Sequence, residues 1–313
     1  MRRRPFSISG VSVSELTLGT WGLSGDAYGA VCESDSEQII LRARALGITG
    51  FETADTYAKG DMEARLGALL SADPEVLFIT KVGTDRESQP PCKRFDPSWL
   101  RERIEASAKR LKRSPIDLVL LHNPSEQVLK RGEAVDVLKS LCQEGRLRSW
   151  GVSAGSPAVA AAALDAGAPS LQLAFNCLWA EDFQSVVHRL KESGTCVLAR
   201  SVLAHGLLCG FWPPDKVFPE SDHRSRRWSA DELRRRLHQL EALRPLIRNE
   251  VTSLRSVALR WVLNHSEVAT AVIGPRSIQQ LDQLVRDVRS APPYLPQEQL
   301  TGLETRLRDF GVR

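Results

Sequence analysis

Short apolar runs alternate with amphipathic stretches along almost the whole chain. The runs are rich in β-branched residues or leucine and lie at residues 16–19, 49–52, 76–81, 117–122, 149–152, 171–175, 195–199 and 269–273. Apolar positions with helical spacing fall at residues 34–46, 63–70, 97–111, 128–143, 158–166, 183–193, 254–263, 278–288 and 297–310. This alternation is typical of parallel strands that are covered by helices.

Eight strand-helix units predict a closed (β/α)₈ barrel, formed as one domain by residues 1–313. An open sheet more often has about five or six strands, whereas an α/β barrel commonly uses about 250 residues or more. Two segments depart from the pattern. Residues 4–13 alternate around Ser9-Gly10, which predicts a β-hairpin that plugs the N-terminal end of the barrel. Residues 201–249 form a long insertion after the seventh strand, and we expect it to cover the cofactor and the substrate.

Composition excludes several classes of protein. Apolar residues make up 42% of the chain and charged residues 26%, and no apolar run approaches the roughly 20 residues of a membrane span. The basic start, Met1 to Phe6, is not followed by the apolar stretch of a secretion signal, so we expect a cytoplasmic protein. The net charge of +4 is spread along the chain, and we expect no nucleic-acid partner.

Metal chemistry and the common nucleotide loops are also disfavoured. The six cysteines have no knuckle or redox-pair spacing, and the six histidines form no paired ligand motif, so we predict no metal site. The sequence contains no Gly-x-Gly-x-x-Gly that opens a helix and no phosphate loop that ends in Gly-Lys-Ser or Gly-Lys-Thr.

Four titratable residues fall at or after the ends of neighbouring predicted strands. Glu52 ends the second strand and Tyr57 follows it, while Lys81 ends the third strand and His122 the fourth. Catalytic groups of α/β barrels lie at this C-terminal rim. A lysine after a buried strand needs a carboxylate, and Glu52 is the available one. The sequence therefore predicts an ion pair between Lys81 and Glu52.

Tyr57 is the predicted proton donor of this group. A phenol with a pKa near 10 is a weak acid at pH 7, but a nearby ammonium stabilises the phenolate and lowers that pKa. We therefore expect Lys81 to lower the pKa of Tyr57. His122 could orient a carbonyl oxygen by hydrogen bonding, and a hydride would have to come from a cofactor.

Three motifs then resemble a known family. Residues 51–57 read FETADTY, residues 79–81 read ITK and residues 120–124 read LLHNP, and together they are similar to the aldo-keto reductase superfamily. The likeness extends from about Val11 to Phe310. It implies a barrel that binds NADPH or NADH and reduces a small-molecule aldehyde or ketone. It also implies that Tyr57, Lys81 and His122 match the family's Tyr, Lys and His, with Glu52 in place of the usual Asp.

The resemblance further implies a set of cofactor-binding positions. They are Gly19, Thr20 and Trp21 after the first strand, Ser153 and Gln172 at the carboxamide, Arg200, Ser201, Leu203 and Gly206 after the seventh strand, and Gly274, Arg276 and Gln280 at the adenosine end. The planar fork of Arg276 suits a 2′-phosphate, which favours NADPH.

Three residues depart from the family pattern. Ala154 stands where many members have Asn, Leu284 replaces a common Asn, and Arg200 replaces the aromatic residue that stacks on nicotinamide. Because a cation at Arg200 disfavours the positively charged oxidised ring, we hypothesise weaker binding of NADP⁺ than of NADPH.

Aromatic residues in the predicted rim loops suggest an apolar substrate pocket lined by Trp21, Trp179 and Trp228, with Trp212 a weaker candidate. Three functions fit these features. The first is NADPH-dependent carbonyl reduction. The second is a nucleotide-bound sensor or regulatory subunit with vestigial catalysis, and the third is the same site oxidising a sugar or alcohol.

Overall fold

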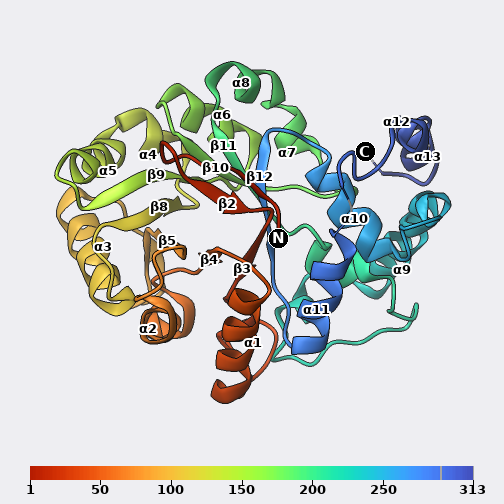
Figure 1. Cartoon of the computed structure of the whole chain (residues 1–313), viewed down its shortest axis with the longest axis horizontal. Helices are drawn as coiled ribbons and strands as arrows, with labels where there is room; N and C mark the ends of the chain where they lie inside the picture. The colour runs from red at the N-terminus through yellow and green to blue at the C-terminus, as the bar shows by residue number, and fades with distance from the viewer. Residues whose placement is uncertain (290, 313) are drawn as a thin grey trace.

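Eight parallel strands form a closed barrel in the computed structural model, which describes residues 1–289 and 291–312 (Figure 1). The strands are β3 (Leu16–Gly19), β4 (Gly50–Glu52), β5 (Leu77–Val82), β8 (Ile116–His122), β9 (Leu147–Ser153), β10 (Ser170–Ala174), β11 (Cys196–Arg200) and β12 (Val268–Ile273). Each strand pairs with the next in this order, and β12 closes the ring on β3. The predicted (β/α)₈ barrel is confirmed.

Helices surround the barrel as a ring in Figure 1. They are α1 (Glu33–Ala45), α2 (Asp61–Leu70), α3 (Pro97–Leu111), α4 (Glu126–Arg131), α5 (Glu133–Gln143), α6 (Pro157–Asp165), α7 (Glu181–Gln184), α8 (Val187–Ser193), α10 (Leu254–Leu263) and α11 (Ile278–Asp287). Their apolar faces pack on the outer faces of the strands and form the largest core cluster. In the part of the chain that the structure describes, no helix is long and apolar enough to cross a membrane.

The N-terminal hairpin plugs the barrel as predicted. Strands β1 (Arg3–Pro5) and β2 (Ser12–Ser14) pair antiparallel. Phe6 and Ile8 from its turn join a separate buried cluster with the inward side chains Ile79, Leu120 and Leu198. These apolar groups fill one end of the barrel and leave the opposite rim for polar side chains.

Three predicted helices are each broken in two. The predicted helix at 128–143 separates into α4 and α5 at Gly132, whose φ is +83°. The pattern at 297–310 separates into α12 (Gln297–Leu300) and α13 (Leu303–Asp309) at Gly302, with a φ of +74°. Left-handed backbone ends a right-handed helix, and glycine adopts it without steric cost. The pattern at 183–193 begins earlier, at Glu181, and divides between α7 and α8.

The insertion after β11 forms its own layer. It holds the 3₁₀ turns η3 (Ala204–Cys209) and η4 (His223–Arg226), the helix α9 (Ala230–Gln239) and the 3₁₀ segment η5 (Leu240–Leu246). These elements, together with α10 and α13, enclose a second apolar cluster, and α9 lies beside α12 and α13 outside the ring in Figure 1. Several smaller elements were not predicted. Besides the 3₁₀ turns of the insertion, they include the 3₁₀ turn η1 (Trp21–Leu23) and the two-residue strands β6 (Thr84–Asp85) and β7 (Cys92–Lys93), which pair with each other.

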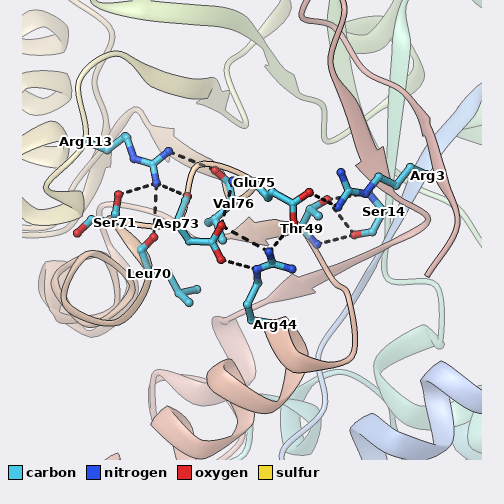
Figure 2. A network of polar contacts seen from close by, with 10 residues as sticks. All are labelled: Arg3, Ser14, Arg44, Thr49, Leu70, Ser71, Asp73, Glu75, Val76 and Arg113. Carbon is cyan, nitrogen blue, oxygen red and sulfur yellow. Dashed lines mark hydrogen bonds and ion pairs between the residues drawn. The ribbon is translucent and has the colours of Figure 1, made fainter.

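Arginine side chains tie loops together at the end of the barrel that the hairpin closes. Arg113 donates to the backbone carbonyls of Leu70, Ser71, Asp73 and Val76, as Figure 2 shows. Arg44 pairs with Asp73 and Glu75, and Arg3 also pairs with Glu75. These contacts contribute to the stability of the fold and not to its chemistry, since the catalytic groups of barrels lie at the opposite rim. The network fixes the loop that enters β5 at the end of the barrel opposite the site residues.

Candidate active site

Lys81 is the central residue of a buried polar group at the C-terminal rim. Its ammonium forms an ion pair with Glu52 on the neighbouring strand β4. It also donates to the Tyr57 hydroxyl at 3.2 Å and to the Thr53 carbonyl at 2.6 Å. An ammonium has three N–H groups, so these partners satisfy all of them. The predicted pairing of Lys81 with Glu52 is confirmed.

Tyr57 lies in a loop that is fastened to strand β5. It begins the 3₁₀ turn η2 (Tyr57–Gly60), and the backbone N–H of Asp55 donates to the Lys81 carbonyl at 3.1 Å. Ala58 and Lys59 have φ values of +47° and +55°, a region that residues with a side chain seldom adopt. The backbone contact of Asp55 with Lys81 therefore fastens the start of the loop that carries the phenol.

The pKa of Tyr57 moves in the direction opposite to the one expected. Burial raises it above the ordinary value, and the nearby charge of Lys81, which favours the phenolate, does not offset that cost. Glu52 adds to the rise because its negative charge disfavours a second anion. Lys81 acts to lower this pKa as expected, but the net direction differs from the expectation because burial outweighs that effect, and the sequence does not show how deeply the phenol is buried.

His122 lies across the phenol ring, with the two ring centroids 6.5 Å apart and the planes nearly perpendicular. Burial lowers the pKa of His122 well below its usual value, and the positive charges of Lys81, Lys93 and Arg200 lower it further. The imidazole is therefore neutral at physiological pH. Its Nδ1 atom is buried and has no hydrogen-bond partner within the described residues, so the ring has bonding capacity for another molecule.

Glu52 extends the group across the barrel to strands β10 and β9. Gln172 Nε2 donates to Glu52 Oε1 at 2.9 Å, and Ser153 Oγ donates to Gln172 Oε1 at 2.8 Å. The two residues assigned to the carboxamide of a cofactor are thus joined to the carboxylate beside Lys81. Gln172 keeps a second N–H and Ser153 keeps oxygen lone pairs, so both can still bind a ligand amide.

The loop after β3 comes close to Glu52 as well. Thr20 is buried, and its hydroxyl donates to the Glu52 carbonyl at 3.1 Å. A side chain at Gly19 would place its Cβ 2.7 Å from Val272 Cγ1, so only glycine fits. Trp21 follows in η1 and packs against the rings of Tyr28 and His223.

The loop after β11 carries the next predicted positions. Arg200 ends the strand, and its Nη2 donates to the Ala154 carbonyl at 2.9 Å. Ser201 and Gly206 have φ values of +56° and +98°, which turn the chain sharply beside the rim. The sequence reasoning missed Asn176, whose side-chain amide donates to the Ser201 carbonyl at 2.9 Å. Its place just after a strand was the signal that could have revealed it.

The predicted adenosine end lies after β12. Gln280 Oε1 accepts from the backbone N–H of Arg276 at 2.8 Å, close to Gly274 in the chain. The Arg276 guanidinium donates to the backbone carbonyls of residues 28, 29 and 30. The residue assigned to a 2′-phosphate is therefore engaged by the loop between β3 and α1.

The insertion meets that same loop over the mouth of the barrel. The backbone N–H of His223 donates to the Ala27 carbonyl at 2.7 Å, and the Tyr28 hydroxyl lies 3.2 Å from His205 Nδ1. Leu203 is half-buried between the two apolar clusters. Sequence reasoning missed Tyr28 and His223, since only the fold brings residues so distant in the chain together.

The candidate pocket tryptophans lie in two places. Trp21 and Trp228 are linked through the rings of His223 and His205, so both face the loop contact over the mouth. Trp179 packs against the second apolar cluster, and the Arg236 guanidinium lies 4.8 Å from its ring centroid. The Trp212 ring lies beside that of Trp228, with the two planes tilted by 60°.

A lysine, a carboxylate, a phenol and a neutral imidazole lie together at the mouth of the closed barrel. This arrangement is typical of an oxidoreductase built on a barrel. The chain belongs to the aldo/keto reductase family, whose sequence model, "Aldo/keto reductase family", matches residues 15–301. This confirms the resemblance noted in the sequence.

Curated and solved relatives agree with that assignment. The aldo-keto reductase YhdN of Bacillus subtilis is 28% identical over 284 residues, which cover 88% of this chain and 85% of the relative. The glycerol dehydrogenase of Gluconobacter oxydans is 25% identical with a TM-score of 0.86, covering 99% of this chain and 96% of that one. The holo form of an aldo-keto reductase from Bacillus halodurans is 25% identical with a TM-score of 0.82, covering 98% and 96%.

Proposed function

We propose that this oxidoreductase reduces an aldehyde or ketone to an alcohol with NADPH, and that Tyr57 supplies the proton. The observation that carries the proposal is the buried contact of the Lys81 ammonium with both the Glu52 carboxylate and the Tyr57 hydroxyl. A lysine held in this way has its charge fixed beside the one acidic O–H of the group. Such a fixed charge stabilises the phenolate left after proton transfer.

The cofactor, when bound, supplies a hydride to the carbonyl carbon. Tyr57 gives its proton to the carbonyl oxygen, so that the substrate gains one hydride and one proton and the phenol becomes a phenolate. Lys81 stabilises that phenolate and Glu52 keeps Lys81 charged, since its carboxylate acts to raise the pKa of Lys81 against the effect of burial. Neutral His122 has a ring nitrogen free to hydrogen-bond the carbonyl oxygen and orient it toward Tyr57.

The raised pKa of Tyr57 also bears on whether the site reduces a carbonyl or oxidises an alcohol. Reduction needs a protonated phenol, whereas oxidation of an alcohol needs a phenolate as base. Because burial raises the pKa of Tyr57 above its ordinary value near 10, the phenol carries its proton at neutral pH. This supports reduction over the oxidative alternative under those conditions.

We further infer that the rim residues Gly19, Thr20, Trp21, Ser153, Gln172, Arg200, Ser201, Leu203, Gly206, Gly274, Arg276 and Gln280 hold the cofactor. The unpartnered His122 Nδ1 and the spare donors and acceptors of Gln172 and Ser153 support a nicotinamide in this place. The contacts between the insertion and the loop after β3 support a role for residues 201–249 in covering it.

Preference for NADPH over NADH is inferred from Arg276. Its guanidinium suits a 2′-phosphate, but it now donates to carbonyls of the loop at residues 28–30. The Nε–H of this guanidinium has no partner among the described residues, so the side chain keeps a donor for a phosphate besides those that the loop engages. Arg276→Met should raise the Kd for NADPH and leave the Kd for NADH unchanged, as measured by quenching of protein fluorescence.

The Tyr57→Phe variant tests the proposal. It keeps the aromatic ring and removes the proton, so the Kd for NADPH should stay within about twofold while kcat with a panel of aldehydes falls by roughly 10²- to 10⁴-fold. Unchanged turnover in this variant would refute the role of Tyr57. Tight NADPH binding without turnover in the natural protein would instead support the sensor alternative.

A further inference from the structure

Arg200 reaches across the mouth of the barrel. It is the last residue of β11, and its guanidinium donates to the carbonyl of Ala154, which follows β9. Strand β10 lies between those two strands in the barrel, so the side chain passes over the end of β10. This path places a fixed positive charge on the rim that also carries Tyr57 and His122.

The Arg200 guanidinium lacks a counter-ion. No carboxylate of residues 1–289 or 291–312 lies within 4.0 Å of it, whereas Arg103 and Arg224 have Asp55 and Asp222 as partners. Burial lowers the pKa of Arg200, and Asp182 opposes this only from a longer distance. A guanidinium has five N–H donors, and Arg200 uses one of them on protein. None of its unused nitrogens is among the buried polar atoms without a partner, so these donors are accessible at the mouth, where a guanidinium can bind an anionic group.

The charges around His122 are of one sign. Besides burial, the groups that lower the pKa of His122 are Lys81, Lys93, Arg200 and Arg86, which are all cations. Lys81 is neutralised by Glu52, and Arg86 approaches Asp26 at 3.8 Å. Lys93 is exposed, and its ammonium donates to the Thr84 hydroxyl and to the His122 carbonyl. Among the described residues, Arg200 is therefore the less exposed of the two cations near His122 that have no carboxylate within 4.0 Å.

We infer that Arg200 binds an anionic group of the substrate, so that the protein acts on aldehydes or ketones that carry a carboxylate or a phosphate. This inference rests on the proposed reductase function and names its substrate class. The guanidinium can stack on a nicotinamide through its face and still donate through its edge, so the two roles are compatible. The carbonyl end of such a substrate lies toward Tyr57 and His122, and its acidic end toward Arg200.

The test compares 4-oxobutanoate with its neutral methyl ester, and glyceraldehyde 3-phosphate with glyceraldehyde. The natural protein should show a kcat/KM about 10- to 100-fold higher for the acidic member of at least one pair, since a hydrogen bond to a charged group contributes that much. The pair that shows the preference identifies carboxylate or phosphate as the group bound. Equal values within both pairs would overturn the inference.

Arg200→Gln should remove the preference. The loss should appear as a higher KM for the acidic substrate with little change in kcat, since the lost contact is made equally in the ground and transition states. Arg200→Lys should recover part of it. Arg86→Gln is the matched control, because it also removes one positive charge from the rim but leaves the contact of Arg200 with the substrate intact. This variant should keep the preference of the natural protein for the acidic substrate. An equal loss for acidic and neutral substrates in Arg200→Gln, with weaker NADPH binding, would instead assign Arg200 to the cofactor alone.

A binding measurement separates this inference from the proposed function. Calorimetry with 4-hydroxybutanoate and 1,4-butanediol, both in the presence of NADP⁺, requires no turnover. Binding of the acid that Arg200→Gln abolishes would support the anion site even in a protein that reduces nothing. Equal binding of the acid and the diol, in a protein that reduces aldehydes, would overturn the anion site and leave the reductase function intact.

Discussion

Asp55 is a buried carboxylate without a hydrogen bond, and replacing it with asparagine should stabilise the protein at alkaline pH. Its side chain is fully buried, and neither carboxylate oxygen has a partner in the described part of the chain. Arg103 Nε lies 3.7 Å away, too far for a hydrogen bond. A cavity of about 230 Å³ adjoins the carboxylate and is also lined by Lys59, Arg86 and Trp99.

The size of the effect follows from the pKa. Burial, with a smaller contribution from Glu63, raises the pKa of Asp55 from 3.8 to about 7. A group whose pKa is raised on folding stabilises the fold fully below the unfolded pKa, and this contribution is lost as the pH rises through the folded pKa. One pKa unit is about 1.4 kcal/mol, so ionising Asp55 costs about 4 kcal/mol of stability above pH 7 and about 1.5 kcal/mol at pH 5.

Urea unfolding of the natural protein and of Asp55→Asn at pH 5 and pH 8 measures this cost. Asparagine has no charge to lose, so the variant should be more stable by about 4 kcal/mol at pH 8 and by much less at pH 5. Asp117→Asn is the matched control. Asp117 is equally buried but accepts from Arg148 at 2.8 Å and from the Phe78 N–H at 2.9 Å, so its loss should destabilise the fold at both pH values. A stability difference between Asp55→Asn and the natural protein that is the same at both pH values would refute the reasoning.

Two further predictions follow from the pKa of Tyr57 and from the arginine network. The rate of alcohol oxidation by NADP⁺ should rise with pH up to and beyond pH 10. Oxidation needs the Tyr57 phenolate as its base, and burial raises the pKa of Tyr57, so the phenolate forms only at high pH. A rate that levels off below pH 8 would contradict this. Arg113→Ala should lower the free energy of unfolding by about 3 kcal/mol, because backbone carbonyls lose a shared charged donor, whereas Arg101→Ala, at the exposed pair with Glu144, should cost less than about 1 kcal/mol. Equal midpoints of the two variants in urea would show that the Arg113 contacts add nothing.

The order of strands and helices could be read from the sequence because it depends on local periodicity. A strand buried on both faces needs a short apolar run, and a covering helix needs one apolar face, so each element carries its own signal. The chemistry at strand ends could be found in the same way, since a barrel brings the C-terminal ends of its strands to one rim. Glu52, Tyr57, Lys81 and His122 were located on that basis. The helix breaks were missed at Gly132 and Gly302, where a single left-handed residue interrupts a continuous apolar pattern.

Tertiary structure alone decided how the charged groups behave. Three features depend on which distant residues lie nearby and on how much water is excluded. They are the raised pKa of Tyr57, the Asp55 carboxylate without a hydrogen bond, and the Arg200 guanidinium without a carboxylate within 4.0 Å. The engagement of Arg276 by the loop after β3 joins residues that are nearly 250 positions apart. Desolvation and long-range contact are properties of the packed chain, so residue types and spacing predict that a charge is present but not its partner or its pKa.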